Sequence, residues 1–313
     1  MVRYLLQFQY LGTHFRGVPR VTPVERAAGY SGVEDALSDA FSCLNYKLAE
    51  PPNIHVSSRT DSGVHALCNT AHADLIYGEN QEELDPDAIV HAVNRNITQM
   101  GRADIRLMNC CPVPPTFNSR HQALGRTYLY RVVSGCYHSR LPIVEFDRSW
   151  GVMERLDIEA MQEAAKHFLG THDFTTFRNK SPDTWTKDPI KTMKAVEVRR
   201  ASCFLKEHDP FCRDLEVLEL IFKSRSFLYR QASTHLQKHF KLLKYLSLFF
   251  LFQIRRMTGL LVAIGRGKLE PKEVCTLLAA RKITAFPKNA QVAPAHGLYL
   301  CNIEYNEKDL LYD

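Results

Sequence analysis

The amino-acid sequence predicts an α+β fold made of two halves, each a sheet backed by helices. Strand-like segments with alternating apolar residues and amphipathic helical segments follow one another irregularly in both halves of the chain. Between the halves, Pro112, Pro114 and Pro115 favour an extended connector. We therefore expect an N-terminal half of residues 1–112 and a C-terminal half of residues 113–313, and a hydrophobic content of 45% is enough to fill their cores.

The N-terminal half contains both kinds of segment. Strands are expected at residues 2–10, 54–56, 64–76 and 104–110, where apolar residues alternate or run together. Helices are expected from Ser31 to about Asn45 and from Asp85 to about Asn94. The second helix begins with Asp-Pro, which combines an N-cap residue with a proline at the first helical position.

The C-terminal half continues the same pattern. Strands are expected at residues 125–134, 193–199, 215–222 and 297–305. Helices are expected at residues 157–169, in a segment that contains QIRRMTGLLVAIG (253–265), and at residues 271–281.

Positive charge is concentrated in one part of the C-terminal half. The chain carries 40 Lys and Arg against 34 Asp and Glu, a net charge of +6. Residues 221–269 include no Asp or Glu but contain Lys223, Arg225, Arg230, Lys238, Lys241, Lys244, Arg255, Arg256, Arg266 and Lys268. Such a segment indicates a polyanionic partner or, as an equal alternative, a solvated helix surface.

The cysteines and the apolar runs exclude two classes of protein. The nine cysteines are an odd number without disulfide-like spacing, which indicates a reducing compartment rather than a secreted disulfide scaffold. The longest apolar run, residues 245–254, is about half as long as a bilayer crossing requires. We therefore expect no membrane span.

The stretch RTDSG sets Asp61 between Arg59 and Gly63 in a turn-like segment flanked by apolar residues. One interpretation is a turn aspartate that accepts backbone hydrogen bonds before the glycine. Another is the catalytic loop of an aspartic protease, but such an enzyme needs two carboxylates that share a proton. The sequence contains no second loop of this kind, which disfavours the protease interpretation.

Two other chemistries are also disfavoured. His65, Cys68 and His72 could be considered as zinc ligands, but residues three apart on an extended segment face opposite sides, and residues four apart are separated by about 13 Å. We expect these side chains to pack in a core. The sequence has no Ser/His/Asp or Cys/His pattern with a G-x-S-x-G context, which disfavours a hydrolase.

The octapeptide RTDSGVHA, residues 59–66, resembles the R-T-D-[AS]-G-V-H-A signature of the TruA-type tRNA pseudouridine synthases. Further segments resemble other motifs of this family, in the family's order. They are YLGTHFRG (10–17), AVNRNI (92–97), FNSRHQALGRTYLYRV (117–132), GTHDFTTFRN (170–179), QIRRMTGLLVAIGRGKL (253–269) and APAHGLYLCNIEY (293–305). The resemblance thus extends over most of the chain.

The resemblance implies two ferredoxin-like or RRM-like halves. Their mixed, largely antiparallel sheets would form a central extended sheet flanked by helices, with the active-site cleft between the halves. It also implies an enzyme that isomerises uridine in tRNA to pseudouridine, with tRNA as its partner and with no cofactor and no metal.

In that reaction the resemblance makes Asp61 the catalytic carboxylate. It would attack the ribose or the base as a nucleophile, or take a ribose proton as a base. Because burial disfavours an ionised carboxylate, a nearby cation is needed, and Arg255 is the candidate. The alternatives for Arg255 are a phosphate contact and a solvent-exposed position on its helix.

Three further residues are expected to bind the substrate. A uridine in folded tRNA is stacked, so the enzyme has to extrude it. The family's R-x-Y-x-Y motif places Tyr128 against the target base, with Arg126 beside it. Tyr130 shares a strand face with Tyr128 and is expected in the core. Arg59 is expected to fill the vacated stack or to hold a flanking phosphate.

The chain departs from the family pattern before QIRRM. Family members run F-L-[YH]-x-Q-[VI]-R without interruption, whereas here residues 231–252 form an atypical insertion. The insertion could displace Arg255, recruit RNA through its lysines, or reflect an alternative or mispredicted splice. Two hypotheses follow: an active tRNA pseudouridine synthase, and a catalytically impaired RNA-binding homologue.

The N-terminal residues bear on the compartment. Arg3, Arg16 and Arg20 precede the first acidic residue, Glu25, as in a mitochondrial presequence, although residues 2–10 also look like a strand. The strand-like character argues against a separate cleavable presequence, whereas the resemblance to a eukaryotic branch of the family implies a mitochondrial location, with the cytoplasm or the nucleus as alternatives. The oligomeric state, the target uridine and any action on mRNA do not follow from the sequence.

Overall fold

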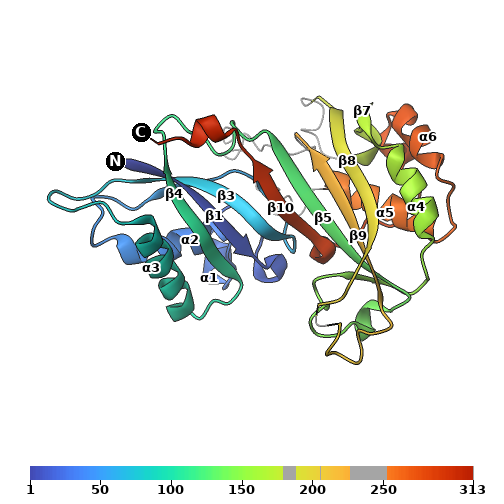
Figure 1. Ribbon diagram of the computed structural model, residues 1–313, viewed down its shortest axis with the longest axis horizontal. Coiled ribbons are helices and arrows are strands. Elements are labelled where there is room, and N and C mark those ends of the chain that lie inside the picture. The colour runs from blue at the N-terminus through green and yellow to red at the C-terminus, as the bar shows by residue number, and fades with distance from the viewer. Residues whose placement is uncertain (179–187, 205, 226–251, 313) are drawn as a thin grey trace. The chain divides into compact units, whose positions relative to one another are not determined.

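The structure is a computed structural model that describes residues 1–178, 188–204, 206–225 and 252–312. The chain forms two compact units: unit 1 comprises Met1–Arg126 and Leu300–Asp313, and unit 2 comprises Thr127–Tyr299. The predicted α+β class is confirmed, because each unit has a mostly antiparallel sheet with helices packed on it (Figure 1). The predicted domain boundary at residue 112 stays a prediction.

The sheet of unit 1 has the strand order β4-β1-β3-β10, with β2 also paired to β3. Its strands are β1 (Val2–Tyr10), β2 (Asn53–Val56), β3 (His65–Leu75), β4 (Ile105–Val113) and β10 (Leu298–Glu304). β1 pairs antiparallel with β3 on one side and with β4 on the other, so the N-terminal strand lies inside the sheet. The C-terminal strand β10 completes a sheet that is otherwise built from the N-terminal part of the chain.

The helices of unit 1 are α1 (Pro23–Ala27), α2 (Val33–Phe41) and α3 (Pro86–Gln99). Helix α3 packs along β4 and contacts α2, as Figure 1 shows. It buries Ile89, Val93 and Ile97, whose spacing puts them on one helix face. Asp85 caps α3 as predicted, because its carboxylate accepts backbone N–H groups of the first turn.

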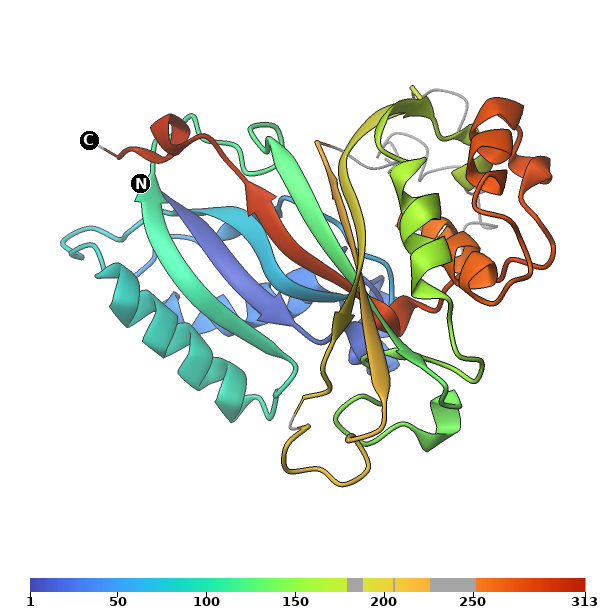
Figure 2. The same cartoon turned by 45° about the vertical axis from the view of Figure 1, so that its right-hand side comes forward.

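The sheet of unit 2 has the order β5-β9-β8-β7, with β6 paired in parallel to β5. Its strands are β5 (Gly125–Ser134), β6 (Trp150–Val152), β7 (Gly170–Asp173), β8 (Ile190–Ala201) and β9 (Glu216–Ser224). Its helices are α4 (Ile158–Lys166), α5 (Phe252–Gly265) and α6 (Glu273–Ala280). Helix α4 packs against both β8 and α5 (Figure 2). No helix in the described part of the chain is both long enough and apolar enough to cross a membrane.

Several element bounds differ from the prediction for local reasons. Helix α3 continues past Asn94 to Gln99 because Ile97 extends its buried face. Strand β4 runs through Pro112 to Val113, so the predicted connector begins inside a strand. A proline fits there because β4 is at the edge of the strand order, where one side of the strand needs no ladder N–H groups. The elements α1, β6 and β7 were not predicted, since they are too short to show a period.

Helix α5 is the most deeply buried helix described in unit 2, with buried residues on all its sides. At Gly259 it lies against the backbone before β10, where a Cβ would be 1.8 Å from the Gln291 carbonyl oxygen. One turn away, the Arg255 carbonyl accepts the N–H of Ala293 at 3.1 Å. Helix α5 and this segment therefore approach too closely to admit a side chain at Gly259.

We expect Gly259→Ala to lower the free energy of unfolding by at least roughly 1–3 kcal/mol, the cost of overpacking a core. In an open helix the same change would stabilise by about 1 kcal/mol, so the sign of the effect tests the contact. Urea denaturation of both proteins measures it. Glu163→Ala on the exposed face of α4 is the control and should change stability by less than about 0.5 kcal/mol. A Gly259→Ala protein as stable as the parent would contradict this packing.

Candidate active site

The RTDSG stretch forms a turn in unit 1 between β2 and β3. Asp61 at its centre is only 2% exposed. The Asp61 carbonyl oxygen accepts the N–H of Val64 at 3.1 Å and so closes the turn. Gly63 has a φ of +81°, in the left-handed region that glycine adopts without steric cost. Asp61 is therefore a buried carboxylate on a turn with a fixed backbone.

The loop of residues 12–17, which follows β1, holds this turn in place. The N–H of Gly63 donates to the Gly12 carbonyl at 3.1 Å, and the Ser62 hydroxyl donates to the Phe15 carbonyl at 3.0 Å. A Cβ on Gly12 would lie 2.0 Å from the Val64 carbonyl oxygen, so glycine alone permits this approach. The YLGTHFRG and RTDSG segments are thus one structural feature of unit 1.

Buried polar side chains support the turn from within unit 1. The Tyr10 hydroxyl lies 2.7 Å from the Thr60 hydroxyl and accepts a hydrogen bond from Asn69 Nδ2 at 3.2 Å. The same Asn69 nitrogen donates to the Ser58 carbonyl at 2.8 Å. The backbone N–H of Gly12 donates to His65 Nδ1 at 2.9 Å. Sequence reasoning did not predict these supporting roles, and only the position of Tyr10 and His65 within the two motifs hinted at them.

The two predicted substrate-binding arginines of unit 1 lie at the start of this turn. Arg126 donates from Nε to the Ser58 hydroxyl at 3.0 Å, next to Arg59 in the chain. Arg59 is half-buried and lines a cavity of about 240 Å³. The structure therefore brings Arg59 and Arg126 to the segment that leads into Asp61.

In unit 2, both tyrosines of the R-x-Y-x-Y motif are buried on β5. Tyr130 is fully buried, and its hydroxyl donates to the Pro294 carbonyl at 2.8 Å. Burial also raises the pKa of Tyr130 well above its usual value. These contacts confirm the core position predicted for Tyr130. Tyr128 is 1% exposed, and its expected contact with the target base stays a prediction.

Neighbouring arginines on α5 have different surroundings. Arg255 donates from Nε to the Ala293 carbonyl at 2.6 Å and is half-buried. Arg256 donates from Nη1 to the carbonyls of Thr176 and Arg178, at 2.9 and 2.6 Å, and burial lowers its pKa to about 10. Arg256 is therefore committed to holding the backbone near residue 177. The predicted pairing of Arg255 with Asp61 joins residues of different units and stays a prediction.

The predicted insertion, residues 231–252, lies outside the described residues except for Phe252. Phe252 is the first residue of α5, and its ring lies beneath the guanidinium groups of Arg255 and Arg256, at 5.5 and 5.3 Å from its centroid. In the described part of unit 2, Arg255 thus belongs to a regular helix.

The histidines considered as zinc ligands have other partners. His65 accepts a backbone N–H, and His72 accepts the backbone N–H of Ser119. Within the described residues, the group whose ligand atoms come close enough for a metal is His138, Asp147 and His296 in unit 2, with separations up to 4.8 Å. It shares no residue with the predicted site. The expectation that the site needs no metal or cofactor stays a prediction.

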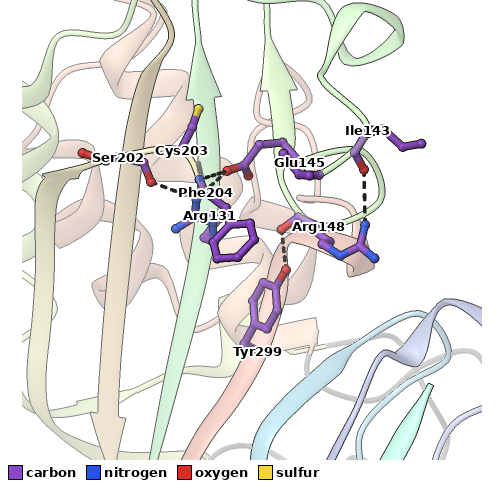
Figure 3. Close-up of a pocket in the computed structure, with 9 residues that line it drawn as sticks. Arg131, Ile143, Glu145, Arg148, Ser202, Cys203, Phe204 and Tyr299 are labelled. Atoms are coloured by element: carbon purple, nitrogen blue, oxygen red, sulfur yellow. Dashed lines mark hydrogen bonds and ion pairs between the residues drawn. The ribbon is translucent and has the colours of Figure 1, made fainter. Parts of the chain in front are cut away.

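A larger cavity of about 630 Å³ lies in unit 2, and none of the predicted site residues is among the residues that line it (Figure 3). Two of its charged lining residues, Arg131 and Glu145, are already paired. Arg131 contacts Glu145 at 2.9 Å and Glu219 at 2.8 Å, and the N–H of Phe204 donates to Glu145 at 3.2 Å. The Tyr299 hydroxyl closes one side by donating to the Arg148 carbonyl. This arrangement stabilises the loops around the cavity.

His72 on β3 is a buried neutral histidine of unit 1. Its Nδ1 accepts the N–H of Ser119 at 3.3 Å and lies 2.9 Å from the Ser119 hydroxyl. Its ring stacks on His55 with 5.0 Å between centroids. Burial, and then the proximity of His55, lower the pKa of His72 to about 4. His72 is therefore neutral in the folded protein at neutral pH.

Comparison with known proteins gives one consistent family. A family model described as tRNA pseudouridine synthase matches residues 164–306. The chain is 36% identical over 308 residues to tRNA pseudouridine synthase-like 1 of Xenopus laevis, covering 98% of this chain and 93% of the relative. It is 38% identical over 305 residues to the Homo sapiens protein of the same name, covering 97% and 90%. It is 31% identical over 306 residues to tRNA pseudouridine synthase A of Sinorhizobium fredii, covering 97% and 100%.

The lowered pKa of His72 predicts a pH-dependent stability. Its folded pKa of about 4 lies below the unfolded value of 6.5, so the unfolded chain takes up the proton first as the pH falls. The contribution is fully present above about pH 6.5 and is lost as the pH falls from there towards 4. We expect the loss of this contribution to lower the free energy of unfolding by roughly 1–3 kcal/mol as the pH falls across this window.

Urea denaturation at a series of pH values measures this effect. The His72→Gln variant should show a shallower decline than the parent, because glutamine has no proton to gain. His91→Gln, which removes an exposed histidine of α3, should decline like the parent. Parallel profiles for the parent and His72→Gln would show that His72 does not titrate between the two states.

Proposed function

The chain belongs to the tRNA pseudouridine synthase family, and on this premise we propose that it isomerises uridine in tRNA to pseudouridine with Asp61 as its catalytic carboxylate. The observation that supports the role of Asp61 most directly is its burial, at 2% exposure, on a turn held by the loop of residues 12–17. A surface turn aspartate would not need this support. A carboxylate that acts in a water-excluding site needs this support from its surroundings.

The reaction is an internal rearrangement that needs no redox partner. The bond from uracil N1 to ribose C1′ breaks, the base turns, and a bond forms from C5 to C1′. The proton on C5 is lost and N1 gains one, so atoms and charge balance. Asp61 either bonds to the substrate as a nucleophile or takes a proton from the ribose, and both roles require its ionised form.

A buried carboxylate stays ionised only with a compensating charge or hydrogen bonds. Arg255 is our candidate for the charge. Its backbone is fixed on α5, and its Nε is bound to the Ala293 carbonyl, so the side chain has a defined position in unit 2. A fixed guanidinium can stabilise charge without first reorganising.

We propose that Tyr128, Arg59 and Arg126 bind the extruded nucleotide and its neighbours. An aromatic ring can stack on a base, and a guanidinium plane can stack or bind phosphate. Arg59 and Arg126 lie at the start of the Asp61 turn, which supports a role close to the reacting uridine.

The alternative of a catalytically impaired RNA-binding homologue rested on the insertion at residues 231–252. The comparisons do not favour it, because identity to named synthases extends over 97–98% of this chain. Absence of pseudouridine in the parent reaction described next would favour the alternative.

Asp61→Asn should abolish pseudouridine formation, with a rate loss of roughly a thousandfold or more, while tRNA binding remains. Asparagine has nearly the same shape but cannot act as a base or a carboxylate nucleophile. Product is measured with uridine-labelled tRNA, and binding with the same tRNA. Asp87→Asn, on the exposed surface of α3, should behave like the parent. Unchanged product from Asp61→Asn would rule out the proposed role.

Arg255→Gln and Arg256→Gln should separate chemistry from folding. Loss of the Arg255 charge should lower the rate by roughly a hundredfold or more, with little change in stability. Loss of Arg256 should lower the free energy of unfolding by roughly 1–3 kcal/mol, because the carbonyls of Thr176 and Arg178 lose their donor. Rate and urea-denaturation measurements on both variants show whether each arginine serves the reaction or the fold. If Arg255→Gln retains the parent rate, Arg255 is not the counter-ion.

We also propose that the protein acts in mitochondria, with the cytoplasm and nucleus as alternatives. Arg3, Arg16 and Arg20 ahead of Glu25 support this location. Because β1 pairs with strands on both sides, a targeting function of these residues would have to leave β1 in the folded protein. Localisation of a tagged full-length chain would test this, and signal confined to the cytosol would exclude it.

A further inference from the structure

A polar cavity of about 240 Å³ lies in unit 1 beside the start of the Asp61 turn. Hydrogen-bond donors dominate its lining. Arg59, Arg120, His55, His72 and His121 contribute to it, and Glu34 is the one carboxylate among the lining residues. The cavity combines residues from α2, the Asp61 turn, β2, β3 and the segment before β5.

His72 gives the cavity a buried donor of fixed orientation. It is 4% exposed and lines the cavity. Its Nδ1 accepts the backbone N–H of Ser119, and a backbone N–H can only donate. The Ser119 backbone N–H and hydroxyl thus hold the ring at Nδ1. Burial disfavours the charged ring, so His72 stays neutral at neutral pH and offers one N–H.

Asn118 orders the opposite part of the lining. Its Oδ1 accepts the backbone N–H groups of Arg120 and His121, at 3.0 and 3.1 Å. This local turn orders the backbone from which the Arg120 and His121 side chains extend.

The single carboxylate does not cancel this excess of donors. Glu34 accepts the backbone N–H of Arg20 at 3.3 Å. Burial raises the pKa of Glu34, and Arg59 opposes that rise, which puts Arg59 close to Glu34. The lining thus contains two guanidinium groups and three imidazoles but only one carboxylate, and Arg59 lies close to that carboxylate. Such a lining suits an anion with several acceptor oxygens, as a phosphate has.

We propose that this cavity binds a backbone phosphate of the RNA substrate, with Arg59, Arg120 and His121 as its principal ligands and His72 as a neutral donor. The proposal rests on the proposed function, since RNA supplies the phosphate. Arg59 and Asp61 are two residues apart, so their Cα atoms lie within about 7 Å. A phosphate held by Arg59 therefore fixes the RNA backbone at short range from the catalytic carboxylate.

Variants of exposed or half-exposed ligands test the cavity without disturbing the core. Arg120→Gln and His121→Gln remove donors from the cavity, and Arg95→Gln removes an exposed arginine from α3 in the same unit as a matched control. The dissociation constant of substrate tRNA is measured for each protein over a series of salt concentrations. We expect Arg120→Gln to weaken binding by roughly tenfold, as loss of a charged hydrogen bond does.

The salt dependence identifies the lost contact. Loss of one phosphate contact reduces the slope of log K against log salt by about 0.7–0.9. We expect this change for Arg120→Gln, a smaller one for His121→Gln, and none for Arg95→Gln. If Arg120→Gln and His121→Gln both match Arg95→Gln in affinity and in slope, the cavity does not bind RNA phosphate.

A further arm separates RNA phosphate from free phosphate. Inorganic phosphate is titrated while the His121 and His55 ring resonances are followed by NMR, with and without tRNA. If tRNA shifts these ring resonances and Arg120→Gln makes the shifts smaller, the proposal is supported. Tight binding of inorganic phosphate that tRNA does not displace would overturn it in favour of a free anion. These readouts measure binding, so a parent protein that makes no pseudouridine would refute the proposed function and leave the cavity test intact.

Discussion

The contact between the loop of residues 12–17 and the RTDSG turn is the constraint on which the site depends. A carboxylate is removed from water only where the surrounding backbone is held tightly enough to keep water out. Here Gly12 allows backbone to lie directly on backbone, and the carbonyls of the loop accept the N–H of Gly63 and the hydroxyl of Ser62. Asp61 is buried because these two segments, far apart in sequence, share one set of hydrogen bonds.

A second close approach of the same kind organises unit 2. Gly259 brings α5 against the segment before β10, and Arg255 is anchored there through its backbone and its Nε. Its neighbour Arg256 faces other carbonyls and holds a different part of the unit. Adjacent arginines on one helix therefore have separate tasks, because successive side chains on a helix point in different directions.

The sequence predicted much of the secondary structure, but it did not predict those element ends that depend on tertiary packing. The bounds of β5 (Gly125–Ser134) agree with the prediction because its alternation and its flanking turn residues are both clear. The end of α3 was underestimated, since its last buried contact at Ile97 depends on a partner surface that the sequence does not specify. The strand was expected to end at Cys110, yet β4 continues through Pro112 to Val113 because its edge position tolerates the missing N–H.

The sequence by itself determined the family, the α+β class and the identity of Asp61 as the residue to test, because these depend on short motifs read along the chain. Tertiary structure alone revealed that Tyr10 and Asn69 support the Asp61 turn, and that Arg59, His72 and Arg120 line one cavity. Hydrogen bonds and cavities join residues that strand pairing and turns bring together across tens of positions. No local pattern in the sequence records such distances, because they are set by the packing of the whole unit.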